Sequence, residues 1–234
     1  MYKYTALIIE PRKHKALEFV LNNFLYNLSN DWQIIIFHGN NNIEYIKNIF
    51  NKLDIIYPNR ITNLINLNID NLHFTQYNNL FYSETLYSYI PNEIFIVFQT
   101  DSIILNDNKD LINLFLDFDY IGAPWLNKEV GNGGFSIRKK SKMLEILKIK
   151  GCPGNQDNVN EDQYFSCLGS KCKLNIEYNI ANFETANRFS VETVFNEKPF
   201  GIHNCWKYLN QEEILFLTTK YPEISELIKL QYNE

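Results

Sequence analysis

The first half of the chain alternates between apolar runs of strand character and segments whose apolar residues recur at helical spacing. The expected strands span residues 5–11, 32–39, 60–69 and 93–104, and the expected helices span residues 13–28, 43–53 and 77–90. Strands and helices that alternate at this spacing require right-handed crossovers, which build a largely parallel sheet covered on both faces. The sequence therefore predicts an α/β fold with a central, mostly parallel sheet flanked by helices.

The second half of the chain is less regular. We expect a short strand at 117–125, a glycine-rich loop and strand at 131–138, helices at 139–150 and from Asn160, a strand and loop at 191–206, and two short helices at 210–230. Asn160 can cap the helix that follows it. Because no internal repeat or linker-like segment interrupts the pattern, we expect one domain over residues 1–234.

Charge and hydropathy argue against two classes of protein. The formal net charge is -5 and the pI is about 5.5, whereas nucleic-acid-binding proteins present a basic face. The compact basic cluster at 138–142 opens an expected helix and is interpreted as a solvated helix face. No apolar run is long enough for a transmembrane helix, and the N-terminus lacks the features of a signal peptide. We therefore expect a cytoplasmic protein with no nucleic-acid partner and no membrane span.

The cysteines give no sign of a metal site. Their positions, which show neither a CxxC pair nor a repeated spacing, are Cys152, Cys167, Cys172 and Cys205. Zinc sites depend on such spacing, so we expect reduced cysteines in or near the core, as is usual in the cytosol.

The segment IFIVFQTDSIIL, residues 94–105, is an apolar run that contains one carboxylate, Asp101. A buried, unpaired charge is costly, but ligands of parallel α/β sheets bind beyond the carboxyl ends of the strands. The expected strand ends carry Glu10, His38 and Asp101, and strand alternation points Gln99 to the same side as Asp101. One carboxylate with neutral oxygens suits Mg²⁺ or Mn²⁺ that is otherwise held by water and substrate phosphates. A turn cap is the alternative, because Thr-Asp-Ser is common turn chemistry.

Three of the nine glycines fall within residues 131–134, in the sequence GNGGFS. Glycines let the backbone approach a ligand closely and expose amides that can meet phosphate or sugar hydroxyls. An ordinary hairpin turn is the alternative, because Asn-Gly is a strong turn signal. The additional Gly134 favours a binding loop.

Two adjacent acids and one histidine complete the candidates. Glu161 and Asp162 begin an expected helix, where the helix dipole stabilises acids, so solvated surface residues are one interpretation. The other interpretation is a general base that deprotonates an acceptor hydroxyl. His203, in the sequence GIHNCW, can ligate a metal or contact phosphate, or it can be a structural residue.

Together and in order, these segments resemble the GT-A family of nucleotide-sugar-dependent glycosyltransferases, and in particular a branch with FQTDS, DYIGAPW, GNGGFS, NEDQYF, FSVE and GIHNCW. The resemblance runs from IIEPR to Trp206. It implies a GT-A-like, Rossmann-like fold with a nucleotide-binding half at about 1–106, an acceptor and catalytic half at about 107–209, and short C-terminal helices at about 210–234. It also implies transfer of a sugar from a nucleotide-sugar donor, expected to be a UDP-sugar, to a hydroxyl of a glycan, protein or small molecule.

The resemblance implies roles for individual residues. In the family a DxD-type motif binds Mn²⁺ or Mg²⁺ on the donor diphosphate; here Gln99 replaces the first acid, which leaves Asp101, with His203 as a second ligand. Asp162 resembles the base of inverting members, and Glu161 the residue that bonds the acceptor or donor sugar. The expected donor contacts are Glu10, Pro11, Arg12, His38, Thr100, Ser102, Gly133 and Gly134. The expected acceptor contacts are Asp119, Tyr120, Trp125 and Trp206.

Two other functions compete with this interpretation. A nucleotide-sugar pyrophosphorylase would need a glycine-rich, basic loop after the first strand, and that loop here, EPRKHK, has no glycine. An inactive sugar-binding or scaffold protein on the same fold is compatible with Gln99, since fold does not guarantee activity. A phosphohydrolase would need a second acid close to Asp101 or a histidine pair, and the sequence offers neither.

Overall fold

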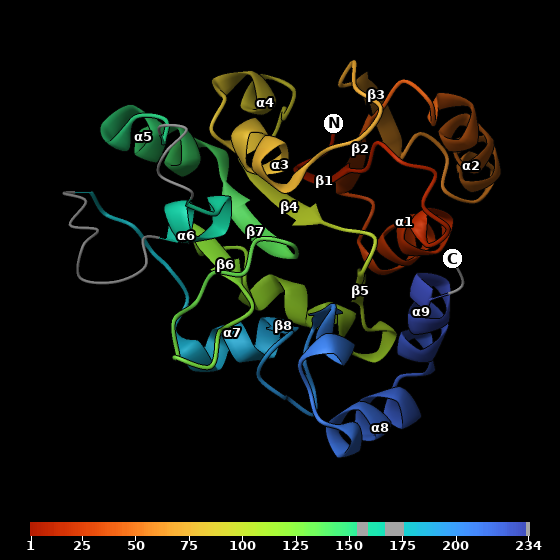
Figure 1. Cartoon of the computed structure of the whole chain (residues 1–234), viewed down its shortest axis with the longest axis vertical. Helices are drawn as coiled ribbons and strands as arrows, with labels where there is room; N and C mark the ends of the chain where they lie inside the picture. The colour runs from red at the N-terminus through yellow and green to blue at the C-terminus, as the bar shows by residue number, and fades with distance from the viewer. Residues whose placement is uncertain (154–158, 167–175, 233–234) are drawn as a thin grey trace.

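The computed structural model describes residues 1–153, 159–166 and 176–232 (Figure 1). Its strands are β1 Tyr4–Ile9, β2 Trp32–His38, β3 Ile61–Asn66, β4 Ile94–Phe98, β5 Ser102–Ile104, β6 Tyr120–Gly122, β7 Ser136–Lys139, β8 Ser190–Val191 and β9 Gly201–His203. Its α-helices are α1 Leu17–Asn27, α2 Ile43–Ile56, α3 Phe74–Phe81, α4 Glu84–Ser88, α5 Lys140–Lys150, α6 Glu161–Ser166, α7 Phe183–Phe189, α8 Gln211–Lys220 and α9 Pro222–Tyr232. Among the described residues there are also two 3₁₀ helices, η1 Asn106–Leu114 and η2 Cys205–Lys207.

Within these described ranges, six strands form a central sheet in the order β3-β2-β1-β4-β7-β6. The first four strands run parallel, and Tyr4 of β1 pairs with Trp32 on one side and with Ile94 on the other. The last two strands pair antiparallel. The predicted α/β class with a central, mostly parallel sheet flanked by helices is confirmed.

Helices cover both faces of this sheet, as the alternating side chains of β1 require. Ala6 and Ile8 face a core shared with α1 and α2, whereas Leu7 and Ile9 face a second core shared with α3, α4 and α5. Figure 1 shows α3 to α6 on one side of the sheet and α1 and α2 on the other. All four of these β1 side chains are buried, which explains why the strand is an uninterrupted apolar run.

The expected strand 93–104 is instead two strands in two sheets. β4 ends at Phe98, and a turn in which the Ser102 N–H donates to the Gln99 carbonyl at 3.1 Å redirects the chain into β5. The Ser102 hydroxyl also accepts from the Gln99 N–H at 2.8 Å. β5 then joins a separate sheet with the order β5-β9-β8, so Gln99 and Asp101 lie in a loop and not in a continuous strand.

The expected helix 77–90 is also divided, into α3 and α4. Ser83 separates them, because its hydroxyl accepts from the Thr85 N–H and caps α4. The expected helices at 139–150, from Asn160 and at 210–230 are present as α5, α6, and α8 with α9.

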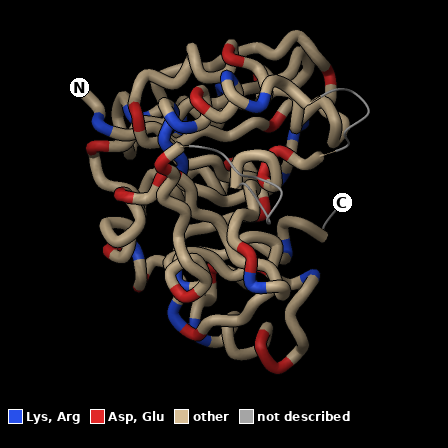
Figure 2. The backbone as a smooth tube through the Cα atoms, turned by 90° about the vertical axis from the view of Figure 1, so that its left-hand side faces the viewer, with Lys and Arg blue, Asp and Glu red and all other residues tan. Residues whose placement is uncertain are grey.

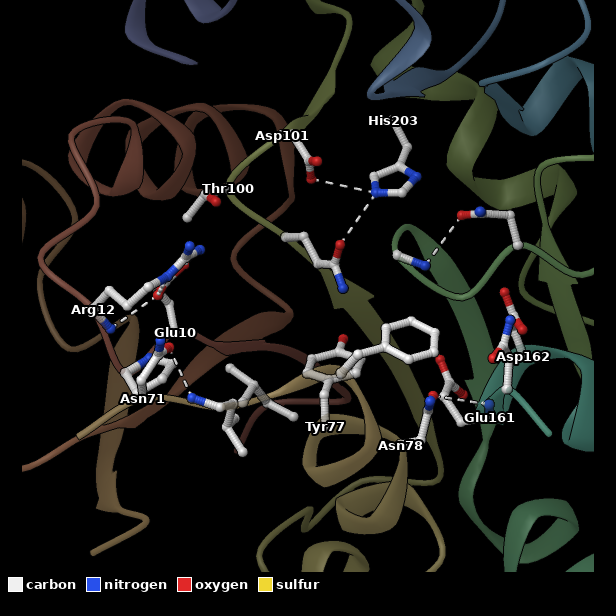
Figure 3. Close-up of a pocket in the computed structure, with 18 residues that line it drawn as sticks. Glu10, Arg12, Asn71, Tyr77, Asn78, Thr100, Asp101, Glu161, Asp162 and His203 are labelled. Atoms are coloured by element: carbon white, nitrogen blue, oxygen red, sulfur yellow. Dashed lines mark hydrogen bonds and ion pairs between the residues drawn. The ribbon is translucent and has the colours of Figure 1, made fainter. Parts of the chain in front are cut away.

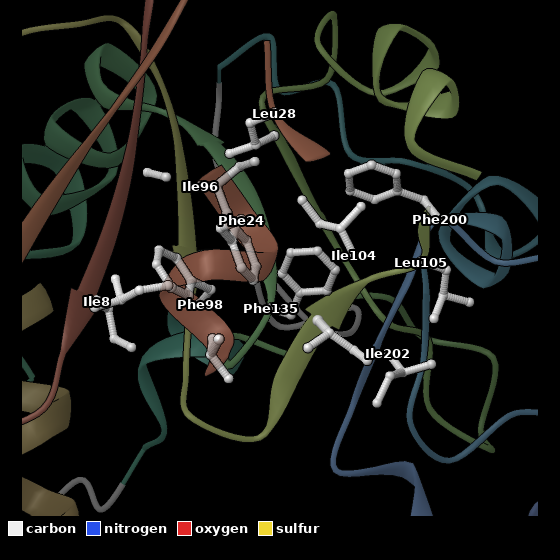
Figure 4. Packing of buried hydrophobic residues seen from close by; sticks show 14 of the residues in the cluster. Ile8, Phe24, Leu28, Ile96, Phe98, Ile104, Leu105, Phe135, Phe200 and Ile202 are labelled. Carbon is white, nitrogen blue, oxygen red and sulfur yellow. The ribbon is translucent and has the colours of Figure 1, made fainter. Parts of the chain in front are cut away.

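An aromatic cluster fixes the second sheet against α1 (Figure 4). Phe24 of α1 stacks on Phe98 with ring centroids 3.8 Å apart and meets Phe135 edge-on at 5.6 Å. Phe135 in turn stacks near Phe189 and Phe200. Since Phe135 directly follows Gly134, this packing anchors the end of the glycine-rich loop.

Charged residues of both signs are interspersed along the backbone (Figure 2). The expectation of a solvated basic face at 138–142 is wrong for its first residue, because the side chain of Arg138 is fully buried. None of the helices in the described part of the chain combines the length and apolar character needed to cross a bilayer.

Candidate active site

A pocket of about 380 Å³ lies where the loops after β1 and β4 meet the glycine-rich loop, α6 and β9 (Figure 3). β1 and β4 run parallel, so the loops that follow them share one edge of the sheet. The expected site residues that line the pocket are Glu10, Pro11, Arg12, Gln99, Thr100, Asp101, Gly134, Glu161, Asp162 and His203. Side chains from both halves of the chain therefore converge on one cavity.

Sheet register brings His203 beside Asp101. Ser102 of β5 pairs with His203 of β9, and the N–H of Asn204 donates to the Asp101 carbonyl at 2.9 Å. His203 Nε2 lies 3.3 Å from Asp101 Oδ1 and 3.2 Å from Gln99 Oε1 (Figure 3). Two oxygens and one nitrogen thus meet at the same wall of the pocket.

His203 lies between two carboxylates. Its Nδ1 is 3.2 Å from Glu192 Oε1, on the side away from Asp101. Burial lowers the pKa of His203, but Asp101 and Glu192 outweigh burial and raise it to about 10. Burial also raises the pKa of Asp101, but the neighbouring His203 holds it below its usual value. At neutral pH the His203 ring is therefore protonated and lies against the ionised Asp101 carboxylate.

These residues fit a divalent cation. Asp101 Oδ1 is buried, and its contact among the described residues is the ion pair with His203 Nε2 at 3.3 Å, so a cation that replaces the His203 proton could be bound by both atoms. A metal-bound histidine commonly directs its other ring nitrogen at a carboxylate, as His203 does toward Glu192. The described residues contain no cluster of three or more His, Cys, Asp or Glu side chains that could hold a metal. A cation here would therefore take further ligands from water or a bound diphosphate.

Glu161 forms a buried ion pair with Arg138. Arg138 donates to Glu161 Oε2 at 2.6 Å and to Oε1 at 2.9 Å, and both side chains are almost completely buried. The N–H of Glu161 donates to Asn78 Oδ1 at 3.0 Å, so a residue of α3 stabilises the start of α6. The interpretation of Glu161 as a solvated surface acid is wrong, because its exposed fraction is 3%.

Asp162, next in sequence, faces the pocket with a carboxylate that is easy to protonate. Its Oδ1 accepts from the Gln163 N–H at 2.7 Å and its Oδ2 from the Gly133 N–H at 3.4 Å. Burial raises the pKa of Asp162, and the negative charge of Glu161 raises it further, to about 7. A carboxylate with this pKa can accept and release a proton near neutral pH.

The glycine-rich loop separates these two groups of side chains. A Cβ at Gly133 would collide with Glu161 Oε1 and lie 2.9 Å from Asp162 Cβ. A Cβ at Gly134 would collide with the His203 ring and lie 3.0 Å from Gln99 Oε1. Adjacent glycines therefore let the loop pass between the acid pair and the His203 group with no room for a side chain.

Glu10 and Arg12 line another part of the pocket, away from Asp162. Arg12 donates to both oxygens of Glu10 through Nε and a terminal nitrogen, each at 2.9 Å, and its N–H donates to Oε1 at 2.9 Å. In Figure 3, Glu10, Arg12 and Asn71 lie at one end of the pocket and Asp162 at the other, with Asp101 and His203 between them. The pocket is therefore elongated: an ion pair (Glu10 and Arg12) lies at one end, the Asp101 and His203 pair in the middle, and the Asp162 carboxylate at the other end.

Three expected donor contacts do not line the pocket. Gly133 lies behind its wall, against Asp162, and Ser102 is buried in the turn after β4. His38 is buried at the end of β2, where its Nδ1 lies 2.7 Å from the Gly39 carbonyl.

The four expected acceptor contacts also lie outside the set of described residues that line this pocket. Asp119 is buried and pairs with Lys139 at 2.9 Å. Tyr120 is buried under the glycine-rich loop and donates to the Gly131 carbonyl at 2.7 Å. Trp125 would contact a Cβ at Gly131, and Trp206 packs against the core. Their contact with an acceptor stays a prediction.

Sequence reasoning missed the charged partners of the site, Arg138 and Glu192, and the buried Asn78. Glu192 stands in the FSVE segment, which offered a signal, but no pattern linked it to His203. Of the cysteines, Cys205 is buried and Cys152 is exposed, both with free thiols, whereas Cys167 and Cys172 lie outside the described residues.

Residues 62–203, more than half of the chain, match a family model described as "Protein of unknown function (DUF5672)". The chain belongs to this family. The matched segment of this DUF5672 protein contains Asp101, Asp162 and His203, but not the loop after β1. No curated protein matches the chain.

Solved glycosyltransferase structures share the fold. The mannosyltransferase PcManGT from Pyrobaculum calidifontis, in complex with GDP-Man and Mn²⁺, has a TM-score of 0.52 and 12% identity, and the match covers 77% of this chain and 54% of that one. The glycosyltransferase GlyE of Streptococcus pneumoniae TIGR4 has a TM-score of 0.57 and 10% identity, and the match covers 100% of this chain and 61% of that one. The DUF5672 protein thus spans little more than half to about three fifths of these neighbours.

Proposed function

We propose that this DUF5672 protein is a metal-assisted glycosyltransferase that moves a sugar from a nucleotide-sugar donor, with UDP as the expected nucleotide, to a hydroxyl acceptor with inversion. The observation that carries the proposal is the position of Gly133 and Gly134, which hold Asp162 on one side of the loop and His203 on the other. Asp162 and His203 line the same pocket, and direct displacement at an anomeric carbon requires a base and a diphosphate site that both face the donor sugar.

The proposed donor lies along the length of the pocket. The nucleoside lies against Glu10, Pro11 and Arg12, and the diphosphate lies at the wall with Asp101 and His203, where Gln99 and Thr100 add neutral oxygens. Asp101, His203 and Gln99 would hold Mn²⁺ or Mg²⁺, and the metal would supply stabilisation of negative charge on the leaving diphosphate. The fold neighbour solved with GDP-Man and Mn²⁺ supports a nucleotide-sugar and a divalent cation as ligands of this fold.

Asp162 is the proposed base. The acceptor hydroxyl gives its proton to the Asp162 carboxylate while its oxygen bonds to the anomeric carbon, and the bond from that carbon to the diphosphate oxygen breaks. The pKa of about 7 means that much of Asp162 is ionised at neutral pH and still basic enough to take the proton. Because Arg138 occupies both oxygens of Glu161, Glu161 orients the start of α6 and is not the base.

A thermal-shift screen of UDP, GDP, CMP and several nucleotide-sugars, each with Mn²⁺ and with EDTA, tests the proposal. A ligand at 100 times its dissociation constant stabilises the folded state by about 2.7 kcal/mol, which shifts the melting temperature measurably. We expect a shift that one nucleotide produces only with metal and that Asp101→Ala abolishes. No shift with any compound would reject the donor site and favour the alternative of a scaffold protein.

A further inference from the structure

Arg138 lies on β7, beneath the pocket and out of contact with solvent. Its guanidinium makes four hydrogen bonds: two to the oxygens of Glu161, one to the Gly133 carbonyl at 3.2 Å, and one to the Ser136 hydroxyl at 2.9 Å. A buried charge is tolerated only where partners replace water. Besides Ser136 of β7 itself, the hydrogen-bond partners of Arg138 belong to the glycine-rich loop (Gly133) and to α6 (Glu161).

Two aromatic rings enclose the guanidinium. Its central carbon lies 4.8 Å from the ring centroid of Phe81 and 5.0 Å from that of Tyr120. Tyr120 also holds the glycine-rich loop itself, through its hydrogen bond to the Gly131 carbonyl. Arg138 is therefore held in one place, so it can act as a fixed point for the groups that it bonds.

The hydrogen bonds and the chain form a closed ring through the backbone of Gly133. Arg138 and the Ser136 hydroxyl both donate to the Gly133 carbonyl, the latter at 3.1 Å. The N–H on the other side of the same residue donates to Asp162 Oδ2. Asp162 is bonded in the chain to Glu161, which Arg138 holds with two hydrogen bonds.

We propose that Arg138 is a positioning residue: by holding the Gly133 carbonyl and the Glu161 carboxylate together, it fixes the loop and α6 relative to each other and aims Asp162 at the acceptor. This inference rests on the proposed function for the role of Asp162, but the hold on Gly133 stands on geometry alone. Lysine cannot replace arginine here, because an ammonium is a single point charge without the planar fork that reaches three groups.

Arg138→Lys tests the inference, and Arg60→Lys is the matched control. Arg60 is also buried and donates to the Trp32 and Leu28 carbonyls and to Asn30, but it precedes β3 at the opposite end of the parallel strands. Both substitutions weaken buried hydrogen bonds, but only Arg138→Lys touches the glycine-rich loop.

In Arg138→Lys we expect the Gly133 amide hydrogen to exchange roughly tenfold faster relative to the β1 amides, as the loss of about one hydrogen bond implies. We expect turnover to fall by roughly 10- to 100-fold while the dissociation constant for nucleotide and Mn²⁺ stays within about twofold, because a small misplacement of a reacting group slows chemistry more than binding. Arg60→Lys changes neither the relative exchange of Gly133 nor turnover.

Ser136→Ala keeps the inference testable if Arg138→Lys does not fold. It removes one of the two donors to the Gly133 carbonyl and the acceptor of Arg138 Nε, but it leaves the ion pair between Arg138 and Glu161. We expect the same changes, at roughly threefold. Unchanged relative exchange of Gly133 in either folded variant would overturn the inference, as would an equal loss of turnover in Arg60→Lys. If the wild type turns over no nucleotide-sugar, the proposed function fails, and the exchange rates still decide whether Arg138 holds the loop.

Discussion

Replacing Asp162 by asparagine is expected to make the protein inactive and, at the same time, more stable. The folded protein raises the pKa of Asp162 from 3.8 to about 7, so folding favours the neutral carboxyl over the carboxylate. Asparagine is neutral at every pH and keeps an oxygen that can accept from the Gln163 N–H, as Asp162 does at 2.7 Å. The substitution therefore removes the electrostatic penalty and preserves the main contact.

The sign and size of the change in the free energy of unfolding follow from the linkage between protonation of Asp162 and folding. A carboxyl with a raised folded pKa costs nothing below its unfolded pKa, and its cost grows as pH rises until the folded pKa is passed. A difference of about 3 pKa units corresponds to a ceiling of about 4 kcal/mol above pH 7. Because Asp162 is partly exposed to the pocket, we expect a gain of about 2 kcal/mol for Asp162→Asn at pH 8, or roughly 4–8 °C in melting temperature.

The assay is thermal unfolding of the wild type and Asp162→Asn at pH 8 and at pH 4, with Asp107→Asn as the control. Asp107 is exposed, so its substitution is expected to change stability by no more than about 0.5 kcal/mol at either pH. A gain for Asp162→Asn that is as large at pH 4 as at pH 8, or a loss at pH 8, would show that the folded protein does not favour the neutral carboxyl. In the same variant we expect nucleotide binding to persist and turnover to fall by roughly 10²- to 10⁴-fold.

Three further outcomes are expected. Asp101→Ala folds like the wild type but loses the nucleotide shift that depends on Mn²⁺ and at least about 100-fold in turnover, and full activity would reject the metal assignment. Glu192→Gln weakens Mn²⁺ binding by about 10- to 100-fold in a titration followed by electron paramagnetic resonance, since it no longer orients His203; equal affinity would contradict that role. Phe24→Ala costs about 3–5 kcal/mol in chemical denaturation, whereas Tyr26→Ala on the same helix costs less than about 1 kcal/mol, because Phe24 is buried and Tyr26 is exposed.

The fold could be predicted because the buried strands are short apolar runs with helical periodicity between them. What the pattern hid was the break at Gln99, where the apolar run continues across a turn from one sheet into another. Thr-Asp-Ser left a turn open as an alternative, but the apolar residues favour a continuous strand, since Ile103 and Ile104 are as buried as Phe95 to Phe98 of β4. The turn depends on the Ser102 hydroxyl, and serine in an apolar run is compatible with either structure.

Local motifs indicated some of the candidate site residues, but the residues that are paired through tertiary packing could not be predicted from the sequence. Asp101, Asp162 and His203 stand in local motifs, so their chemistry can be inferred from neighbours in the chain. Arg138 and Glu161 are 23 residues apart, and their pairing depends on how β7 and α6 pack. A basic residue at the start of a basic cluster favours a surface position on composition alone, and only the three-dimensional fold shows that Arg138 is buried.

The most direct test of the account is release of nucleoside diphosphate from a panel of UDP- and GDP-sugars, with and without Mn²⁺. We expect that one donor is cleaved, that cleavage requires the metal and is faster with a hydroxyl acceptor, and that Asp162→Asn does not cleave it. We expect the rate to rise with pH to a half-maximum near 7. No cleavage of any donor by a folded protein that still binds nucleotide and Mn²⁺ would contradict the central claim and leave a nucleotide-binding protein without transferase activity.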